Sequence, residues 1–128
     1  MDSFRRAAEA RDAAALEALL ADDVVFTSPV AHKPYPGKAM TAAILRGVLR
    51  VFEDFRYVRT IVSADGRDHA LMFRATVDGK DLQGCDFLHL NEAGLVDDLT
   101  VMVRPLSAAN ALAAAMAAQF PRIASEAV

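Results

Sequence analysis

The 128-residue sequence has one cysteine, three histidines and no excess of positive charge. Cys85 alone cannot form an intramolecular disulfide, which is typical of a protein from a reducing compartment. His32, His69 and His89 lack the spacing of metal ligands, and no carboxylate pair complements them, so we expect no metal site. There is also no glycine-rich phosphate loop, which argues against a nucleotide. The sequence therefore predicts a protein that works without a cofactor.

Acidic and basic residues are interspersed, and the net charge is −3. A nucleic-acid-binding face needs clustered basic residues, so we expect no nucleic-acid partner. The least charged run, residues 105–120, is too short and too rich in alanine to span a bilayer. The charged N-terminus leads into no apolar signal segment. These features predict a soluble, cytoplasmic protein with no membrane partner.

Hydrophobic residues make up 54% of the sequence, which supports the core of one domain, and the chain is too short for two. We expect a single domain over residues 1–120. Pro121 is expected to begin a loose C-terminal tail at 121–128.

The N-terminal half has apolar residues at helical spacing. We predict helical structure over residues 3–21, broken near Asp12, which is a good N-cap for a second short helix. A short strand at 24–27 is followed by a loop at 30–36, where two prolines disfavour strand pairing. Residues 37–52 have the pattern of a longer helix.

The C-terminal half changes to the alternating pattern of strands. Three turn sequences separate four predicted strands, at residues 57–63, 70–77, 80–90 and 95–104. Asp78-Gly79 is a strong hairpin signal, because a type I′ turn needs positive φ at both central residues. A last helix is predicted over 107–116. This order predicts an α+β fold, with an antiparallel sheet of four long strands and a short first strand.

One predicted strand carries a carboxylate among apolar neighbours. Strand alternation puts Asp86 on the same face as Leu82, Gly84, Leu88 and Leu90. A carboxylate on an apolar face is costly unless it is hydrogen-bonded, paired or neutral. The neighbouring strands have matching apolar faces, formed by Leu71, Phe73, Ala75 and Val77 and by Leu95, Leu99, Val101 and Val103, the latter interrupted by Asp97. Together they predict a concave apolar surface that the helices cover.

The opposite, outer face of the sheet is too apolar for plain solvent exposure and too polar for a core. It carries Met72, Arg74, Phe87, His89, Thr100, Met102 and Arg104. Such a mixture is typical of a homodimer interface. Cover by the C-terminal helix of the same chain is the alternative, and the sequence does not decide between the two.

Five segments resemble, in order and spacing, the SnoaL-like branch of the nuclear transport factor 2-like superfamily. They are residues 21–29, Pro36-Gly37, Gly84-x-Asp86, Asn91-x-x-Gly94 and residues 101–105, within a resemblance that covers about residues 1–106. This branch includes polyketide cyclases and is related to ketosteroid isomerase. The resemblance implies a cone, in which a curved sheet wraps around helices, with a pocket at the open end. It also implies a dimer through the sheet.

The resemblance also implies where catalytic residues would lie. The isomerases' base falls on Ser28, their oxyanion-binding tyrosine on Phe4 and a supporting tyrosine on Leu45. Only their acid is matched, by Asp86. A serine without a partner base cannot abstract a carbon-bound proton, and a phenylalanine cannot donate a hydrogen bond. We therefore do not expect the ketosteroid isomerase reaction.

Asp86 has two interpretations from the sequence. Burial could raise its pKa and make it a general acid or hydrogen-bond donor. It could instead be a structural carboxylate, paired with Tyr57, His32 or a strand N–H. His32 lies in the predicted loop and is the best replacement base, because its pKa suits neutral pH. A solvated loop histidine is the alternative.

The sequence thus predicts an apolar pocket for a small hydrophobic molecule, with Asp86 and His32 as catalytic candidates. Expected ligand-binding residues are Phe4, Phe26, Ser28, Tyr35, Leu45, Val48, Tyr57, Leu71, Phe73, Leu88, Leu99, Val101 and Val103. One hypothesis is a cofactor-free isomerase, cyclase or hydratase acting on a polyketide- or terpenoid-like carbonyl compound. The alternatives are a non-catalytic ligand carrier or sensor, and a protein-interaction module.

Overall fold

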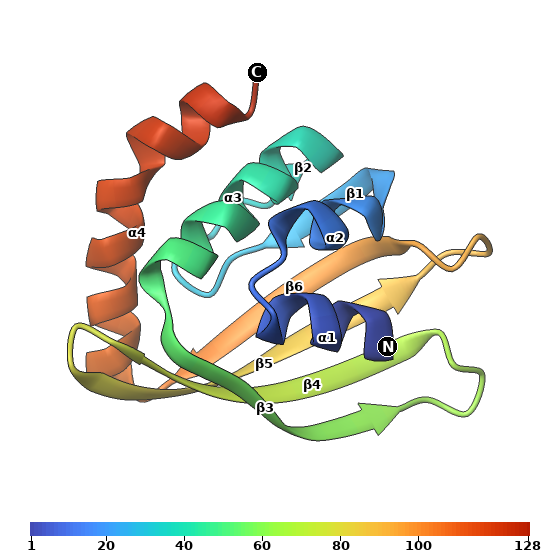
Figure 1. The fold of residues 1–128 in the computed structure, drawn as a ribbon, viewed down its shortest axis with the longest axis horizontal. Helices are drawn as coiled ribbons and strands as arrows, with labels where there is room; N and C mark the ends of the chain where they lie inside the picture. Colours follow the sequence, from blue (N-terminus) through green and yellow to red (C-terminus); the bar gives the residue numbers. More distant parts are fainter.

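The computed structural model describes residues 1–128 and has four helices and six strands (Figure 1). In chain order the elements are α1 (Asp2–Glu9), α2 (Ala13–Ala18), β1 (Leu20–Thr27), β2 (Tyr35–Pro36), α3 (Lys38–Val51), β3 (Glu53–Val62), β4 (Asp68–Val77), β5 (Lys80–Leu90), β6 (Val96–Arg104) and α4 (Leu106–Glu126). The predicted α+β class is confirmed.

The six strands form one sheet in the order β2-β1-β6-β5-β4-β3. Strands β3 to β6 pair as the predicted antiparallel meander. Asp78 and Gly79 form the β4–β5 turn, and both have positive φ. Strand β1 pairs parallel with β6 and antiparallel with β2, so the sheet is mixed at this edge.

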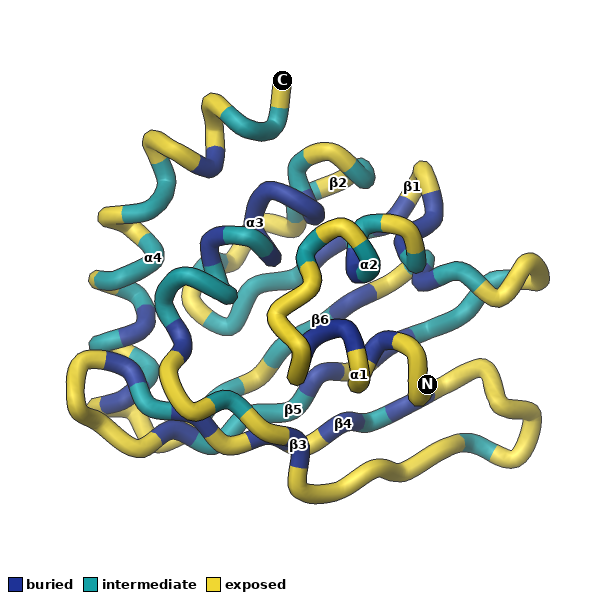
Figure 2. The backbone as a smooth tube through the Cα atoms, viewed as in Figure 1, coloured by how far each residue is buried: buried dark blue, intermediate teal, exposed yellow.

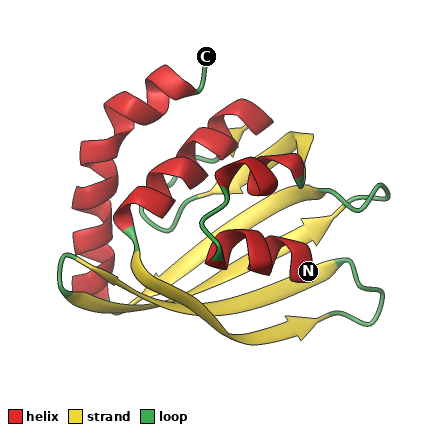
Figure 3. Ribbon diagram, in the orientation of Figure 1, coloured by secondary structure: helices red, strands yellow, loops and turns green.

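The helices lie on one side of the curved sheet (Figure 3). Asp12 caps α2 as predicted, because its carboxylate accepts a hydrogen bond from the Ala15 N–H at 3.1 Å. Helices α1 to α3 cover the concave face, and α4 packs along α3 at one end of the sheet. The arrangement is the expected cone.

The concave face of β4 and β5 is buried as predicted. Leu71 and Phe73 of β4 and Leu82 and Leu88 of β5 are at most 2% exposed. Asp86 lies among them at 8% exposure. Buried positions follow the central strands and the turns of α1 and α3 (Figure 2).

Strand β6 differs from the predicted alternation. His89 pairs with Asp98, whereas the next residue of β5, Leu90, pairs with Val96, so Asp97 is the extra residue of a β-bulge. Val96 is consequently buried in the core, and Asp97 contacts His89, with 2.6 Å between Oδ1 and Nδ1. The prediction that Leu95 and Asp97 share the concave face was wrong, because alternation does not continue through a bulge.

Several element boundaries were also wrong. β1 begins at Leu20, inside the predicted helix, because the Leu19 carbonyl accepts from the Val96 N–H at 2.8 Å and joins this segment to β6. β3 begins at Glu53, before its predicted start. Tyr35 and Pro36 form a two-residue strand instead of a loop, which is compatible with proline because β2 lies at the sheet edge.

The predicted C-terminal tail is helical. α4 continues past residue 116 and through Pro121 to Glu126. Ile123 in this segment is fully buried, so tertiary packing holds the helix together beyond the proline. No helix of the protein has the length and apolarity needed to cross a membrane.

The outer face of the sheet is not covered by α4, whose packing partner is α3 and whose side chains reach the concave side. The alternative of intramolecular cover was therefore wrong. Met72, Phe87 and Met102 on this face are 37%, 41% and 60% exposed.

Candidate functional site

A cavity of about 250 Å³ lies between the concave sheet face and the helices. Hydrophobic residues make up 22 of its 25 lining residues. They come from the four helices, from β1, β2, β3, β4 and β6, from Phe52 between α3 and β3, and from the loop after β1. Asp86 of β5 is the only carboxylate among them, and no lysine, arginine or histidine lines the cavity.

Asp86 is hydrogen-bonded to one side chain, Tyr57 of β3. The Tyr57 hydroxyl donates to Oδ2 of Asp86 at 2.6 Å. The two residues reach each other across β4, because Tyr57 pairs with Phe73 and Phe73 pairs with Gly84. Oδ1 of Asp86 has no protein partner, so this oxygen is available to a molecule in the cavity.

Burial decides the charge of this pair. It raises the pKa of Asp86 from 3.8 to about 7, although the hydrogen bond from Tyr57 acts in the opposite direction. Burial, reinforced by the neighbouring Asp86, also raises the pKa of Tyr57 well above its usual value. Near neutral pH, Asp86 is therefore a mixture of acid and carboxylate, and Tyr57 remains a hydrogen-bond donor.

Aromatic rings enclose the pair on one side. Phe55 lies 5.0 Å, centroid to centroid, from both Tyr57 and Phe73, and Phe52 lies 5.6 Å from Phe73. Phe73 lies directly over Gly84, where an added Cβ would be 2.6 and 2.7 Å from two ring carbons. Position 84 therefore requires glycine, because the Phe73 ring leaves no room for a side chain there.

Two polar side chains near the α1–α2 connection fix this wall of the cavity. The Glu9 carboxylate accepts a hydrogen bond from the backbone N–H of Tyr57 at 3.1 Å. Arg11 donates to the carbonyl of Leu49 at 2.6 Å and to that of Phe52, which satisfies the C-terminal end of α3. Leu49 and Phe52 both line the cavity.

Most of the expected ligand-binding residues line the cavity. They are Phe4, Phe26, Ser28, Tyr35, Leu45, Val48, Tyr57, Phe73, Leu99 and Val101. Leu71, Leu88 and Val103 do not line it; the first two are buried in the core beneath the cavity.

The two polar candidates of the β1–β2 region differ in position. His32 is exposed and is not part of the cavity lining, so the structure does not bring it to Asp86. Ser28 lines the cavity. Its hydroxyl oxygen accepts one hydrogen bond, from the Val30 N–H at 3.1 Å. No base adjoins Ser28.

Among the lining residues that sequence reasoning missed, two groups form walls of the cavity. Phe52 and Phe55 lie at the α3–β3 junction, where β3 was predicted to begin later. Leu112, Met116 and Phe120 come from α4. Their spacing of four residues is a helical stripe, and this signal was present in the sequence.

No three His, Cys, Asp or Glu side chains come together as a candidate metal site.

The α+β cone formed by these elements is the fold of the nuclear transport factor 2-like superfamily. Residues 1–99 match the model of the SnoaL-like domain, and the chain belongs to this family. α4 lies beyond the matched residues. No curated protein matches the chain significantly.

Solved structures are similar over nearly the whole chain. A crystal structure described as a steroid delta-isomerase from Pseudomonas aeruginosa is 40% identical, with a TM-score of 0.90 over 97% of this chain and 90% of that one. An uncharacterised protein with a cystatin-like fold from Silicibacter pomeroyi is 35% identical, with a TM-score of 0.90 over 98% and 89%. A putative polyketide cyclase from Pseudomonas putida shares the fold at 22% identity, with a TM-score of 0.68 over 84% and 90%.

Proposed function

We propose that the cavity binds a neutral, largely apolar molecule of one or two rings and holds its carbonyl oxygen at Oδ1 of Asp86, whose other oxygen accepts the hydrogen bond from Tyr57. The observation that carries this proposal is the hydrogen-bonded pair in an otherwise apolar cavity. An engineered cavity of about 150 Å³ binds benzene, so about 250 Å³ suits a somewhat larger ligand. The absence of a cation from the lining disfavours an anionic ligand.

The protonated form of Asp86 is the form that binds a carbonyl group. A neutral carboxyl donates to the carbonyl oxygen from Oδ1, and this polarises the C=O bond toward enol or oxyanion character. Ionised Asp86 has no proton to donate. Proton-transfer reactions such as isomerisation or cyclisation use this polarisation, and the similarity to the P. aeruginosa protein described as a steroid delta-isomerase supports such chemistry.

A non-catalytic carrier is the second candidate, and the lining favours it in one respect. Apart from Asp86, the ionisable lining residues are Tyr35 and Tyr57, and no second carboxylate or histidine is available as a base. Chromatography coupled to mass spectrometry, applied to candidate ketones after incubation with the protein, separates the two functions, because it resolves isomers of equal mass. A carrier returns its ligand unchanged, whereas an enzyme returns an isomer or a product.

The binding proposal can be tested with Prodan, a neutral naphthyl ketone whose emission shifts in apolar surroundings. Its affinity should fall by about tenfold per pH unit once Asp86 ionises above about pH 7. The Asp86→Asn variant, whose amide donates at every pH, should bind Prodan without this dependence. 2-Acetonaphthone should displace Prodan about tenfold better than 2-ethylnaphthalene, which has the same shape but no acceptor. Wild-type binding that is independent of pH contradicts the proposed role of Asp86.

We also propose that the outer sheet face forms a homodimer. Across β4, β5 and β6, Met72, Cys85 and Met102 lie in one row, and Phe87 lies in the next row. These rows form an exposed apolar centre, and their exposure in the isolated chain is typical of an interface.

Charges on both sides of this centre indicate how two copies would meet. Arg74 and Arg104 share one row, and Asp68 and Asp98 share a row about 20 Å further along the strands. A twofold axis across the strands puts the arginine row of each copy over the aspartate row of the other. An axis along the strands would oppose like charges.

Sedimentation velocity tests this arrangement. The Arg104→Asp and Asp98→Arg chains should each dimerise more weakly than the wild type, because like charges then face each other. An equimolar mixture of the two variants should restore the dimer. A wild-type monomer at micromolar concentration, or a mixture no stronger than its components, overturns the proposal.

A further inference from the structure

The mouth of the cavity lies between α4 and the loop that follows β1. Leu112, Met116 and Phe120, each one turn apart, face the cavity from α4. Most lining residues are buried or half-buried, and the two exposed ones are Val30 in the loop and Ala117 in α4. A ligand therefore enters past α4.

An aromatic contact closes this mouth. The Phe120 ring lies 5.9 Å, centroid to centroid, from the ring of Tyr35 in β2. Tyr35 lies 6.4 Å from Phe26 of β1, and all three rings line the cavity. A molecule of two rings that enters between Tyr35 and Phe120 has to separate these rings, and exchange by this route requires α4 to move.

The last turns of α4 are attached to α3 by an apolar contact. Pro121 has no N–H, so the helical hydrogen bond to the Ala117 carbonyl is missing at this point. Beyond it, Ile123 is fully buried against α3. A Cβ at Gly47 of α3 would lie 2.6 Å from Cδ1 of Ile123, so the contact depends on glycine.

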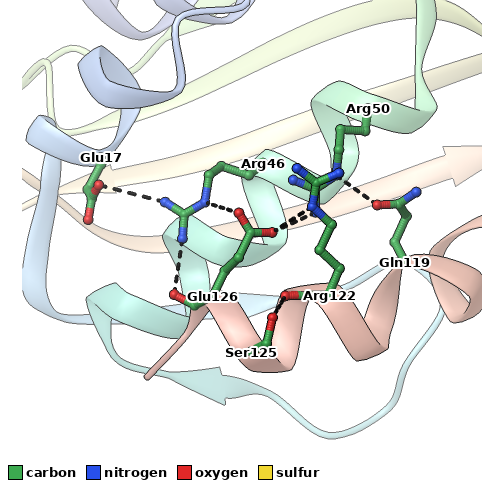
Figure 4. Close-up of polar contacts among 7 residues, drawn as sticks. All are labelled: Glu17, Arg46, Arg50, Gln119, Arg122, Ser125 and Glu126. Atoms are coloured by element: carbon green, nitrogen blue, oxygen red, sulfur yellow. Dashed lines mark hydrogen bonds and ion pairs between the residues drawn. The ribbon is translucent and has the colours of Figure 1, made fainter.

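Ion pairs complete the attachment (Figure 4). The Glu126 carboxylate lies 3.3 Å from Nε of Arg46 and 3.0 Å from Nη2 of Arg50, and both arginines belong to α3. Arg50 also donates to Oε1 of Gln119 at 2.7 Å. These side chains are about one quarter exposed, so the pairs are less screened than fully exposed ones. We call the contacts that Gln119, Ile123 and Glu126 make with α3 the latch.

We propose that α4 is the lid of the cavity and that the latch limits the rate of ligand exchange. The inference rests on the ligand-binding function proposed above. α4 begins after the residues that match the family model, so the lid is inferred from this chain's own contacts. Because Gln119, Ile123 and Glu126 do not line the cavity, weakening the latch should favour the open lid without changing the contacts of the bound state.

This proposal has a kinetic signature. The proposal has the lid closed in the ligand-bound protein as it is in the free one, so loss of latch contacts should favour opening in both. The association and dissociation rate constants should then rise together, and the Kd should stay nearly constant. A latch that merely stabilises the fold would instead leave the rates unchanged or weaken binding.

Stopped-flow fluorescence with Prodan measures both rates. For Glu126→Ala we expect each rate constant to rise about tenfold, with the Kd changed by less than about twofold. Gly47→Ala displaces Ile123 and should act in the same direction. The matched control is Glu17→Ala, which removes another carboxylate partner of Arg46, 3.8 Å away on α2, without touching α4. The control should exchange Prodan like the wild type.

Unchanged rates in both latch variants overturn the lid, as does a rise in Glu17→Ala equal to that in Glu126→Ala. Amide hydrogen exchange provides a readout that needs no ligand. Residues 113–120 should exchange faster in Glu126→Ala than in the control, while β4 and β5 stay protected. If Prodan fails to bind the wild type, the proposed function is refuted, and hydrogen exchange alone decides the lid.

Discussion

Replacing Asp86 by asparagine should stabilise the protein at neutral and alkaline pH. The folded-state pKa of Asp86 is about 7, against 3.8 for an unperturbed aspartate. Between these values the unfolded chain is ionised at this position while the folded protein holds a proton. The stability of the wild type should therefore fall by about 1.4 kcal/mol per pH unit from about pH 4 to about pH 7 and stay constant above that.

The total loss, about 4 kcal/mol, is an upper estimate of what the charge of Asp86 costs. Asparagine has the same shape, accepts the hydrogen bond from Tyr57 and carries no charge, so this loss is absent in the variant. We expect similar stabilities near about pH 4 and an advantage for Asp86→Asn of up to about 4 kcal/mol near about pH 8.

Urea denaturation of both proteins across this pH range gives the difference directly, because titrations common to both cancel. Asp81→Asn is the control, since it removes an exposed carboxylate from the same strand. A difference that does not change with pH, or a wild type that is more stable than the variant at alkaline pH, refutes the argument that burial dominates the ionisation of Asp86.

Three further substitutions test the walls of the site. Gly84→Ala should cost about 1–3 kcal/mol and reduce Prodan affinity, because the new Cβ displaces the Phe73 ring; urea denaturation and titration measure both effects. Arg11→Ala should cost about 1–3 kcal/mol in the same denaturation assay, because two carbonyls at the end of α3 lose a charged donor. Tyr57→Phe removes the hydrogen bond that lowers the pKa of Asp86, so the midpoint of Prodan binding should move to higher pH, and a downward shift contradicts the assignment.

Local signals in the sequence were sufficient for most of the sheet. Asp78-Gly79 specifies its turn through backbone conformation alone, and alternation correctly put Asp86 on the buried face. The bulge at Asp97 could not be predicted, because it depends on how β5 and β6 align and not on either strand alone. The same limit applied to Tyr57, which was one of three possible partners for Asp86 until the strand register selected it.

The C-terminal helix shows the limit of local rules most clearly. Pro121 normally indicates a helix end, and the surrounding alanines give a weak apolar pattern. The helix continues because Ile123 fits over Gly47 and Glu126 pairs with α3, and these contacts join residues about eighty positions apart. The extension of α4 beyond residue 116 thus depended on tertiary contacts that no local pattern reveals.

The aromatic lining has a spectroscopic consequence. The chain has two tyrosines and no tryptophan, and both tyrosines, Tyr35 and Tyr57, line the cavity. The intrinsic emission of the unmodified protein therefore originates entirely at the mouth and the floor of the binding site. Tyr35 contacts α4 through Phe120, and Tyr57 is hydrogen-bonded to Asp86. The substitutions Tyr35→Phe and Tyr57→Phe, made singly, would separate the emission of Tyr35 at the mouth from that of Tyr57 beside Asp86. No label would have to be attached.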